Sequence, residues 1–122
     1  MGGQMTGKVA LVTGSGSGIG KATALAFAYE GAKVVIANRT QESGEQVVRA
    51  IEASGGEATW IRADVSQSAE VEALVRAIIT TYGRLDYAFN NAGSGGRGGW
   101  VAEIQEEDWD QTIDGYLKSV WL

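Results

Sequence analysis

A glycine-rich segment between an apolar run and a helical pattern is the feature that most constrains the fold. Residues 13–20 read Thr-Gly-Ser-Gly-Ser-Gly-Ile-Gly and follow Val-Ala-Leu-Val at residues 9–12. Glycine lets a backbone turn sharply and approach a ligand closely, and the free amides at the start of the next helix point toward an anion such as a diphosphate. The spacing is Gly-x-x-x-Gly-x-Gly, and by itself it is also typical of a flexible loop. A strand before it and a helix after it favour a nucleotide site.

The rest of the chain alternates short apolar runs with helical patterns. Each run is rich in branched or aromatic residues and stops at glycine or a small polar residue, as strands buried on both faces of a parallel sheet do. The predicted strands are residues 9–12, 34–37, 58–61 and 85–89. The predicted helices are residues 19–30, 41–54, 66–82 and 105–122. This order predicts an α/β fold with right-handed crossovers and a parallel sheet, in one domain spanning residues 1–122.

Composition excludes several classes of chemistry. The 122 residues contain no cysteine, histidine or proline, which excludes disulfides, a Ser-His-Asp triad and a Cys-type zinc site. Acid–base work would fall to carboxylates, lysine, tyrosine or a bound cofactor. A net charge of −5 argues against nucleic acid as a partner. The sequence has no apolar stretch long enough for a membrane span and no leader-peptide pattern, so we expect a cytoplasmic protein without a metal site.

Polar residues follow the second predicted strand, where this fold type places the adenosine ribose. An acidic residue there accepts hydrogen bonds from the ribose hydroxyls and repels a 2′-phosphate. This chain has Asn38 and then Arg39, which removes the repulsion and supplies a guanidinium that can bind phosphate bidentately. The pair favours NADP over NAD, although a solvated arginine at a strand end is the alternative.

Two further motifs follow the third and fourth predicted strands. Asp64 could accept a hydrogen bond from the adenine amino group while Val65 packs against the ring, although a turn or helix cap is the alternative. Residues 90–93 read Asn-Asn-Ala-Gly, which lets the backbone pass close to a ligand or simply forms a turn. Residues 93–99 are glycine-rich and are either a flexible loop or a loop at the edge of a ligand site.

Together these motifs resemble the classical short-chain dehydrogenase/reductase family, and the resemblance covers residues 8–122. It implies a Rossmann-type, doubly wound sheet, here incomplete with about four strands in the order 3-2-1-4. It also implies hydride transfer between NADP(H) or NAD(H) and an alcohol or ketone, and a homo-oligomer at full length. The cofactor-binding residues that it implies are Gly14, Ser15, Ser17, Gly18, Ile19, Gly20, Asn38, Arg39, Asp64, Val65, Asn90, Ala92 and Gly93.

The sequence departs from this family in its catalytic residues. Members use a serine and a Tyr-x-x-x-Lys pair that lie beyond a fifth strand, which these 122 residues do not reach. Only Tyr29 and Lys33 have the required spacing, and Gly31 breaks the helix between them. Tyr116 stands where members have an assisting asparagine, and we expect its ring simply to pack. No catalytic residue is therefore predicted.

Three interpretations remain at this stage. The chain is the cofactor-binding portion of a dehydrogenase, a stand-alone dinucleotide-binding module without catalysis, or a partial product without function. In each, the fourth strand would form an open apolar edge of the sheet, so we expect marginal stability and a tendency to associate.

Overall fold

The computed structural model describes residues 3–16, 18–93 and 100–122, which form an α/β unit. The strands are β1 (Val9–Thr13), β2 (Lys33–Asn38), β3 (Glu57–Arg62) and β4 (Tyr87–Phe89). The main helices are α1 (Gly18–Tyr29), α2 (Gln41–Ala53), α3 (Ser68–Tyr82) and α4 (Glu106–Ile113), and a π-helical turn (Asp114–Lys118) links α4 to α5 (Ser119–Trp121). No helix in the described residues is long and apolar enough to cross a membrane.

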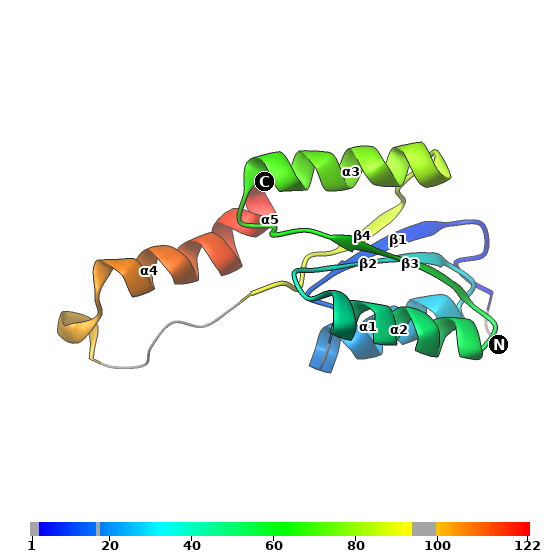
Figure 1. Cartoon of the computed structure of the whole chain (residues 1–122), viewed down its shortest axis with the longest axis horizontal. Coiled ribbons are helices and arrows are strands. Elements are labelled where there is room, and N and C mark those ends of the chain that lie inside the picture. Colours follow the sequence, from blue (N-terminus) through cyan, green and yellow to red (C-terminus); the bar gives the residue numbers. More distant parts are fainter. Residues whose placement is uncertain (1–2, 17, 94–99) are drawn as a thin grey trace.

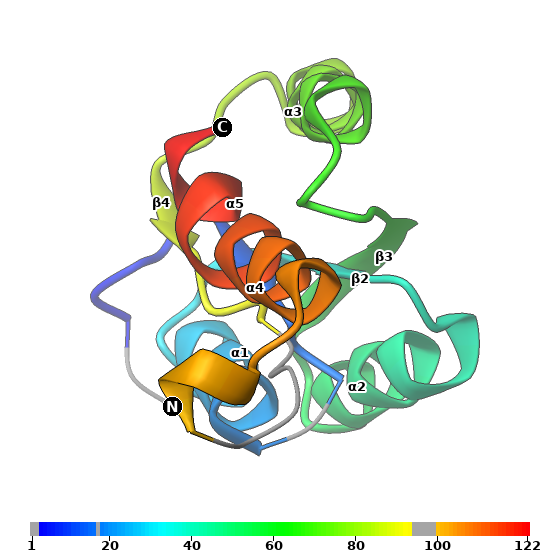
Figure 2. The same ribbon diagram turned by 90° about the vertical axis from the view of Figure 1, so that its left-hand side faces the viewer.

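The four strands form one parallel sheet in the order β3-β2-β1-β4, which confirms the predicted topology. Figure 1 shows α1 and α2 on one face of this sheet and α3 on the other. Figure 2 shows the same layers end-on, with α4 in front of the sheet, beyond the carboxyl ends of the strands. The helices thus cover both faces, and the carboxyl edge of the sheet lies next to α4.

Both faces of the sheet are apolar because successive apolar side chains of the two central strands, β1 and β2, point to opposite faces. Successive side chains of a strand point to opposite faces, and in β2 Val34 and Ile36 face α1 and α2, whereas Val35 faces α3. The first face packs against Ile51 of α2, and the second packs against Ile78 of α3. These side chains are fully buried, as the continuous apolar run in the sequence of the strand predicts.

Element boundaries differ from the predicted ones where side chains bind the backbone. Helix α3 begins at Ser68 and not at Ser66, because the amide and hydroxyl of Ser66 donate to the Asp64 carboxylate in a turn. Strand β4 begins at Tyr87 because Asp86 binds the start of β1, donating its amide to the Val9 carbonyl and accepting from the Val9 amide. The single helix predicted over residues 105–122 contains the π-helical turn.

Gly44 in the middle of α2 provides the space for Trp60 of β3. A Cβ atom at position 44 would overlap indole Cδ1 and lie 2.8 Å from the Asn38 Oδ1 atom. Alanine normally stabilises a helix interior by about 1 kcal/mol relative to glycine. Here we expect Gly44→Ala to lower the free energy of unfolding by about 1–2 kcal/mol, because overpacking outweighs that gain. Urea unfolding checks this value against Gln46→Ala, an exposed substitution on the same helix, and a stabilised Gly44→Ala protein would contradict it.

Candidate functional site

A cleft of about 660 Å³ opens at the carboxyl ends of the strands. Its volume lies in the range of small-molecule sites. The predicted site residues that line it are Gly14, Asn38, Arg39, Asp64, Val65, Ala92 and Gly93. Residues that were not predicted also line it, among them Gly16, Ser43 and Ser66 beside the sheet and Glu107, Gln111 and Asp114 from the α4 region. The structure therefore brings together the ends of all four strands at one cavity.

The glycine-rich turn is held by close backbone packing. Gly14 has a φ of 63°, and a Cβ atom there would lie 2.8 Å from the Ala92 Cα atom. A Cβ atom on Gly20 would overlap the Gly14 carbonyl oxygen. Gly18 has a φ of 56°, is exposed, and has open space where its side chain would be. Two of these glycines allow the turn to pack, and the third leaves its outer side accessible.

Other predicted residues of this turn have different positions. Ser15 is fully buried, and its hydroxyl donates to the Val12 carbonyl at 3.0 Å, so it fixes the turn from the inside. Ile19 is 71% exposed at the start of α1. Asn90 is also exposed, and Ser17 lies outside the described residues. Whether these residues contact a ligand stays a prediction.

Thr13 joins the ends of β1 and β4, a role that the sequence analysis missed. Its hydroxyl oxygen accepts from the amides of Asn91 and Ala92, each at 3.0 Å. The Asn91 side chain in turn donates to the Gly14 carbonyl at 3.3 Å. A threonine before the first glycine and an asparagine after the fourth strand are a usable signal once the two strands are known to be neighbours.

The side chains of Asn38 and Arg39, at the end of β2, have different surroundings. The Asn38 Oδ1 atom accepts from the Trp60 indole at 2.7 Å, and its Nδ2 atom donates to the Ser43 hydroxyl at 3.1 Å. The Arg39 side chain is exposed and lines the cleft. Arg39 is therefore available to a ligand as a cation, whereas the Asn38 amide is held on two sides by residues that the sequence analysis had not selected.

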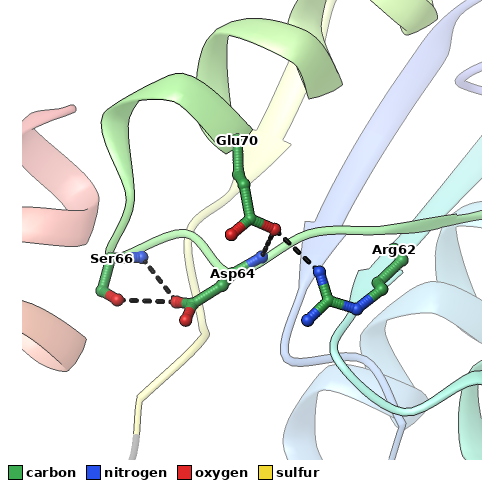
Figure 3. A network of polar contacts seen from close by, with 4 residues as sticks. All are labelled: Arg62, Asp64, Ser66 and Glu70. Carbon is green, nitrogen blue, oxygen red and sulfur yellow. Dashed lines mark hydrogen bonds and ion pairs between the residues drawn. The ribbon is translucent and has the colours of Figure 1, made fainter.

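Asp64 is the centre of a polar network at the end of β3 (Figure 3). Its Oδ1 atom accepts from the hydroxyl of Ser66 at 2.6 Å and from the Ser66 amide at 3.0 Å. Its own amide donates to a carboxylate oxygen of Glu70, which also accepts from Arg62 at 2.9 Å. The Ser66 hydroxyl lowers the pKa of Asp64 below its ordinary value, burial opposes this, and the Ser66 amide, Arg39 and Arg62 add to the lowering. Asp64 is thus an ionised acceptor at neutral pH.

Removing the Ser66 hydroxyl should change the titration of Asp64. We expect Ser66→Ala to raise the pKa of Asp64 toward its ordinary value of 3.8, because the largest cause of the lowering is lost. A carboxyl whose pKa is lowered on folding stabilises the protein above its unfolded pKa, and this contribution is lost as pH falls through the folded pKa. Carboxyl NMR titration measures the shift, with Ser54→Ala at the end of α2 as the control. An unchanged Asp64 titration would contradict the assignment.

Tyr116 lies in the π-helical turn, directly after the cleft-lining residues Asp114 and Gly115. Its ring rests on Gly93, where a Cβ atom would come within 2.8 Å of the Tyr116 Cζ atom. The side chain remains 52% exposed. Tyr116 therefore packs on one side, against a residue that lines the cleft.

The Tyr29–Lys33 pair lies away from this cleft. Tyr29 is the last residue of α1 and Lys33 is the first residue of β2, at the amino end of the sheet. The Lys33 ammonium is 5.9 Å from the centroid of the Tyr82 ring. The pair thus stands at the edge of the sheet opposite to the cleft.

Comparison with known proteins identifies the family. The model of the family described as short chain dehydrogenase matches residues 8–122. The chain belongs to the short-chain dehydrogenase family. It is 45% identical over 120 residues to a 3beta-hydroxysteroid dehydrogenase of Mediterraneibacter gnavus, with 98% of this chain and 44% of that protein covered. It is 40% identical over 121 residues to a cyclohexanol dehydrogenase of Acinetobacter, with 99% and 48% covered.

Solved structures of short-chain dehydrogenases share the fold. A metagenomic short-chain oxidoreductase, crystallised in complex with NADP, superposes with a TM-score of 0.93 at 37% identity, covering 97% of this chain and 53% of that one. The chain spans about half the length of the curated relatives it matches. These similarities do not favour the alternative of a binding module unrelated to dehydrogenases.

Proposed function

We propose that the cleft binds a nicotinamide dinucleotide, with NADP(H) preferred over NAD(H). The observation that carries this proposal is the meeting of three different groups at one cavity. Gly14 and Gly16 bring bare backbone to it, Arg39 brings a cation, and Asp64 brings an ionised acceptor. These groups match in kind a diphosphate, a 2′-phosphate and an adenine amino group. Bound there, the cofactor would supply the hydride chemistry of the family.

Several of the proposed contacts have a physical basis in the structure. Gly18 is an exposed residue at the start of α1, where free amides favour a phosphate. Arg39 can pair with a 2′-phosphate, and the NADP complex of the similar metagenomic oxidoreductase supports this direction of preference. Asp64 is held ionised, and Val65 lines the same end of the cleft, which suits the adenine ring. At the other end, Ala92 and Gly93 would lie beside the second ribose.

Ser15, Ser17, Ile19, Gly20 and Asn90 complete the proposed cofactor-binding set. Gly20 acts through the packing of the turn, and Ser15 acts through its hydrogen bond to the backbone. Ile19 offers an exposed apolar surface for the nicotinamide end. Ser17 and Asn90 are retained from the resemblance alone.

For the whole protein we propose hydride transfer between NADP(H) and an alcohol or ketone carbon. The similar proteins are a hydroxysteroid dehydrogenase and a cyclohexanol dehydrogenase, which are both alcohol dehydrogenases in the broad chemical sense. Their different substrates support the reaction class without selecting one substrate for this protein. We also propose that the whole protein assembles as a homo-oligomer.

The 122 residues by themselves are expected to bind the cofactor without transferring hydride. Tyr29 and Lys33 stand at the edge of the sheet opposite to the cleft. By the resemblance, Tyr116 stands where members of the family have an assisting asparagine. An assay with NADPH and a panel of ketones should therefore show no oxidation of NADPH above the rate without protein. Turnover that requires folded protein would contradict this expectation.

Fluorescence titration tests the proposed binding. The tryptophans of the chain should be quenched saturably by NADPH, because the reduced nicotinamide accepts their excitation energy. The control is Asp86→Asn, which changes a carboxylate at the amino end of the sheet and leaves the cleft intact. The proposal is wrong if wild type and a Gly14→Val variant show the same non-saturable quenching.

A further inference from the structure

Trp60 fixes the orientation of the Asn38 side chain. The indole comes from β3, lies against the backbone of Gly44, and donates from its Nε1 atom to the Asn38 Oδ1 atom at 2.7 Å. An indole N–H can only donate, whereas an asparagine amide has a donating and an accepting end. The amide must therefore turn its oxygen toward Trp60. Its nitrogen must then point the other way.

The nitrogen end of Asn38 faces the wall of the cleft. A Cβ atom on Gly16 would lie 2.7 Å from Asn38 Nδ2, and Gly16, Asn38 and Ser43 all line the cavity. One amide hydrogen is donated to the Ser43 hydroxyl. The second has no acceptor among the residues that the structure describes. At this point the cleft therefore presents a hydrogen-bond donor.

The donating and accepting ends of the Asn38 amide favour different cofactors. A 2′-phosphate only accepts hydrogen bonds near neutral pH, whereas a 2′-hydroxyl can also donate to an acceptor. A rotated Asn38 would present its oxygen to the cleft and would disfavour the phosphate. Trp60 is not among the described residues that line the cavity, and its hydrogen bond connects it to the cavity through Asn38.

We propose that Trp60 is a positioning residue for cofactor selection, which holds Asn38 as a donor toward the 2′-phosphate. This inference rests on the proposed dinucleotide function and deepens it. It assigns part of the preference for NADP(H) to a side chain on the third strand, in addition to the charge of Arg39.

Trp60→Phe tests the proposal because it removes the donor and keeps an aromatic ring. We expect the ratio of NADH to NADPH dissociation constants to fall roughly 3- to 10-fold, as one lost or reversed hydrogen bond would cause. Trp121→Phe, which removes an exposed indole from α5, should leave this ratio unchanged. A merely structural role would weaken both cofactors equally, and an unchanged ratio in Trp60→Phe would overturn the proposal.

A second measurement needs no substitution of Trp60 and covers the case in which Trp60→Phe does not fold. In ¹⁵N-labelled wild type, the Asn38 side-chain amide resonances should shift with adenosine 2′,5′-bisphosphate and much less with adenosine 5′-monophosphate. Equal shifts would overturn the role of Asn38 as donor. Failure of wild type to bind NADPH or NADH would instead overturn the proposed function. If wild type prefers NADPH and Trp60→Phe keeps the same preference, only the role of Trp60 is overturned.

Discussion

Gly20→Ala is expected to destabilise the protein by roughly 2–3 kcal/mol and to abolish cofactor binding. The added Cβ atom would overlap the Gly14 carbonyl oxygen and lie 2.8 Å from the Asn91 Nδ2 atom. The first of these is a backbone atom inside a turn, so it cannot move aside as the tip of a flexible side chain can. Helix α1 would have to separate from the turn, which would displace the backbone that lines the cleft.

Gly18→Ala is the control for the effect on stability. Gly18, unlike Gly20, has a positive φ, and its missing side chain would meet nothing within 4 Å. Only the left-handed backbone conformation then disfavours alanine, by about 1–2 kcal/mol. Chemical unfolding of both variants, with NADPH titration of each, measures the difference. A Gly20→Ala protein as stable as wild type would show that the turn and α1 do not pack as closely as described.

Arg39→Ala is expected to weaken NADPH binding about 10- to 100-fold while NADH binding stays within about twofold. A hydrogen bond between charged groups contributes about 1.5–3 kcal/mol, and 1.4 kcal/mol corresponds to a factor of ten in affinity. Arg39 is exposed and lines the cleft, so its loss should leave the fold intact. Parallel titrations with the two reduced cofactors give both constants.

Arg49→Ala controls for the loss of a positive charge. Arg49 is an exposed arginine of α2, outside the residues that line the cleft, and its removal changes the net charge by the same amount. NADPH binding to this variant should match wild type at moderate ionic strength, because exposed charges beyond the Debye length are screened. An equal loss in both variants would mean that net charge, and not the position of Arg39, governs affinity.

The order of the strands was predictable because burial leaves a strong trace in the sequence. Residues 34–37 are apolar without alternation, and the structure buries Val34, Val35 and Ile36 between two helical layers. Parallel strands joined by helices leave few topologies, and the family resemblance selected the order 3-2-1-4 that the structure has. The strand ends then had to meet at one edge.

Side-chain partners across the sheet were not predictable in the same way. The bond between Trp60 and Asn38 joins residues 22 positions apart, and the bonds from Thr13 join residues almost 80 positions apart. Such pairs depend on the register of neighbouring strands, and a continuous apolar run that is buried on both faces has no alternation from which to read that register. The burial of Ser15 by its bond to the Val12 carbonyl was likewise not predictable, and its contact with a ligand stays a prediction.

Mapping NADPH onto ¹⁵N-labelled protein by NMR is the most direct test of the central claim that one cleft at the carboxyl edge binds the dinucleotide. We expect the largest amide shifts in the turn at residues 14–20, at Asn38 and Arg39, at Asp64 and Val65, and at Ala92 and Gly93. The amide resonances of residues at the amino edge of the sheet, such as Lys33 and Asp86, should keep their chemical shifts. Shifts centred on the amino edge, or no saturable shifts at all, would contradict binding of the dinucleotide in the cleft.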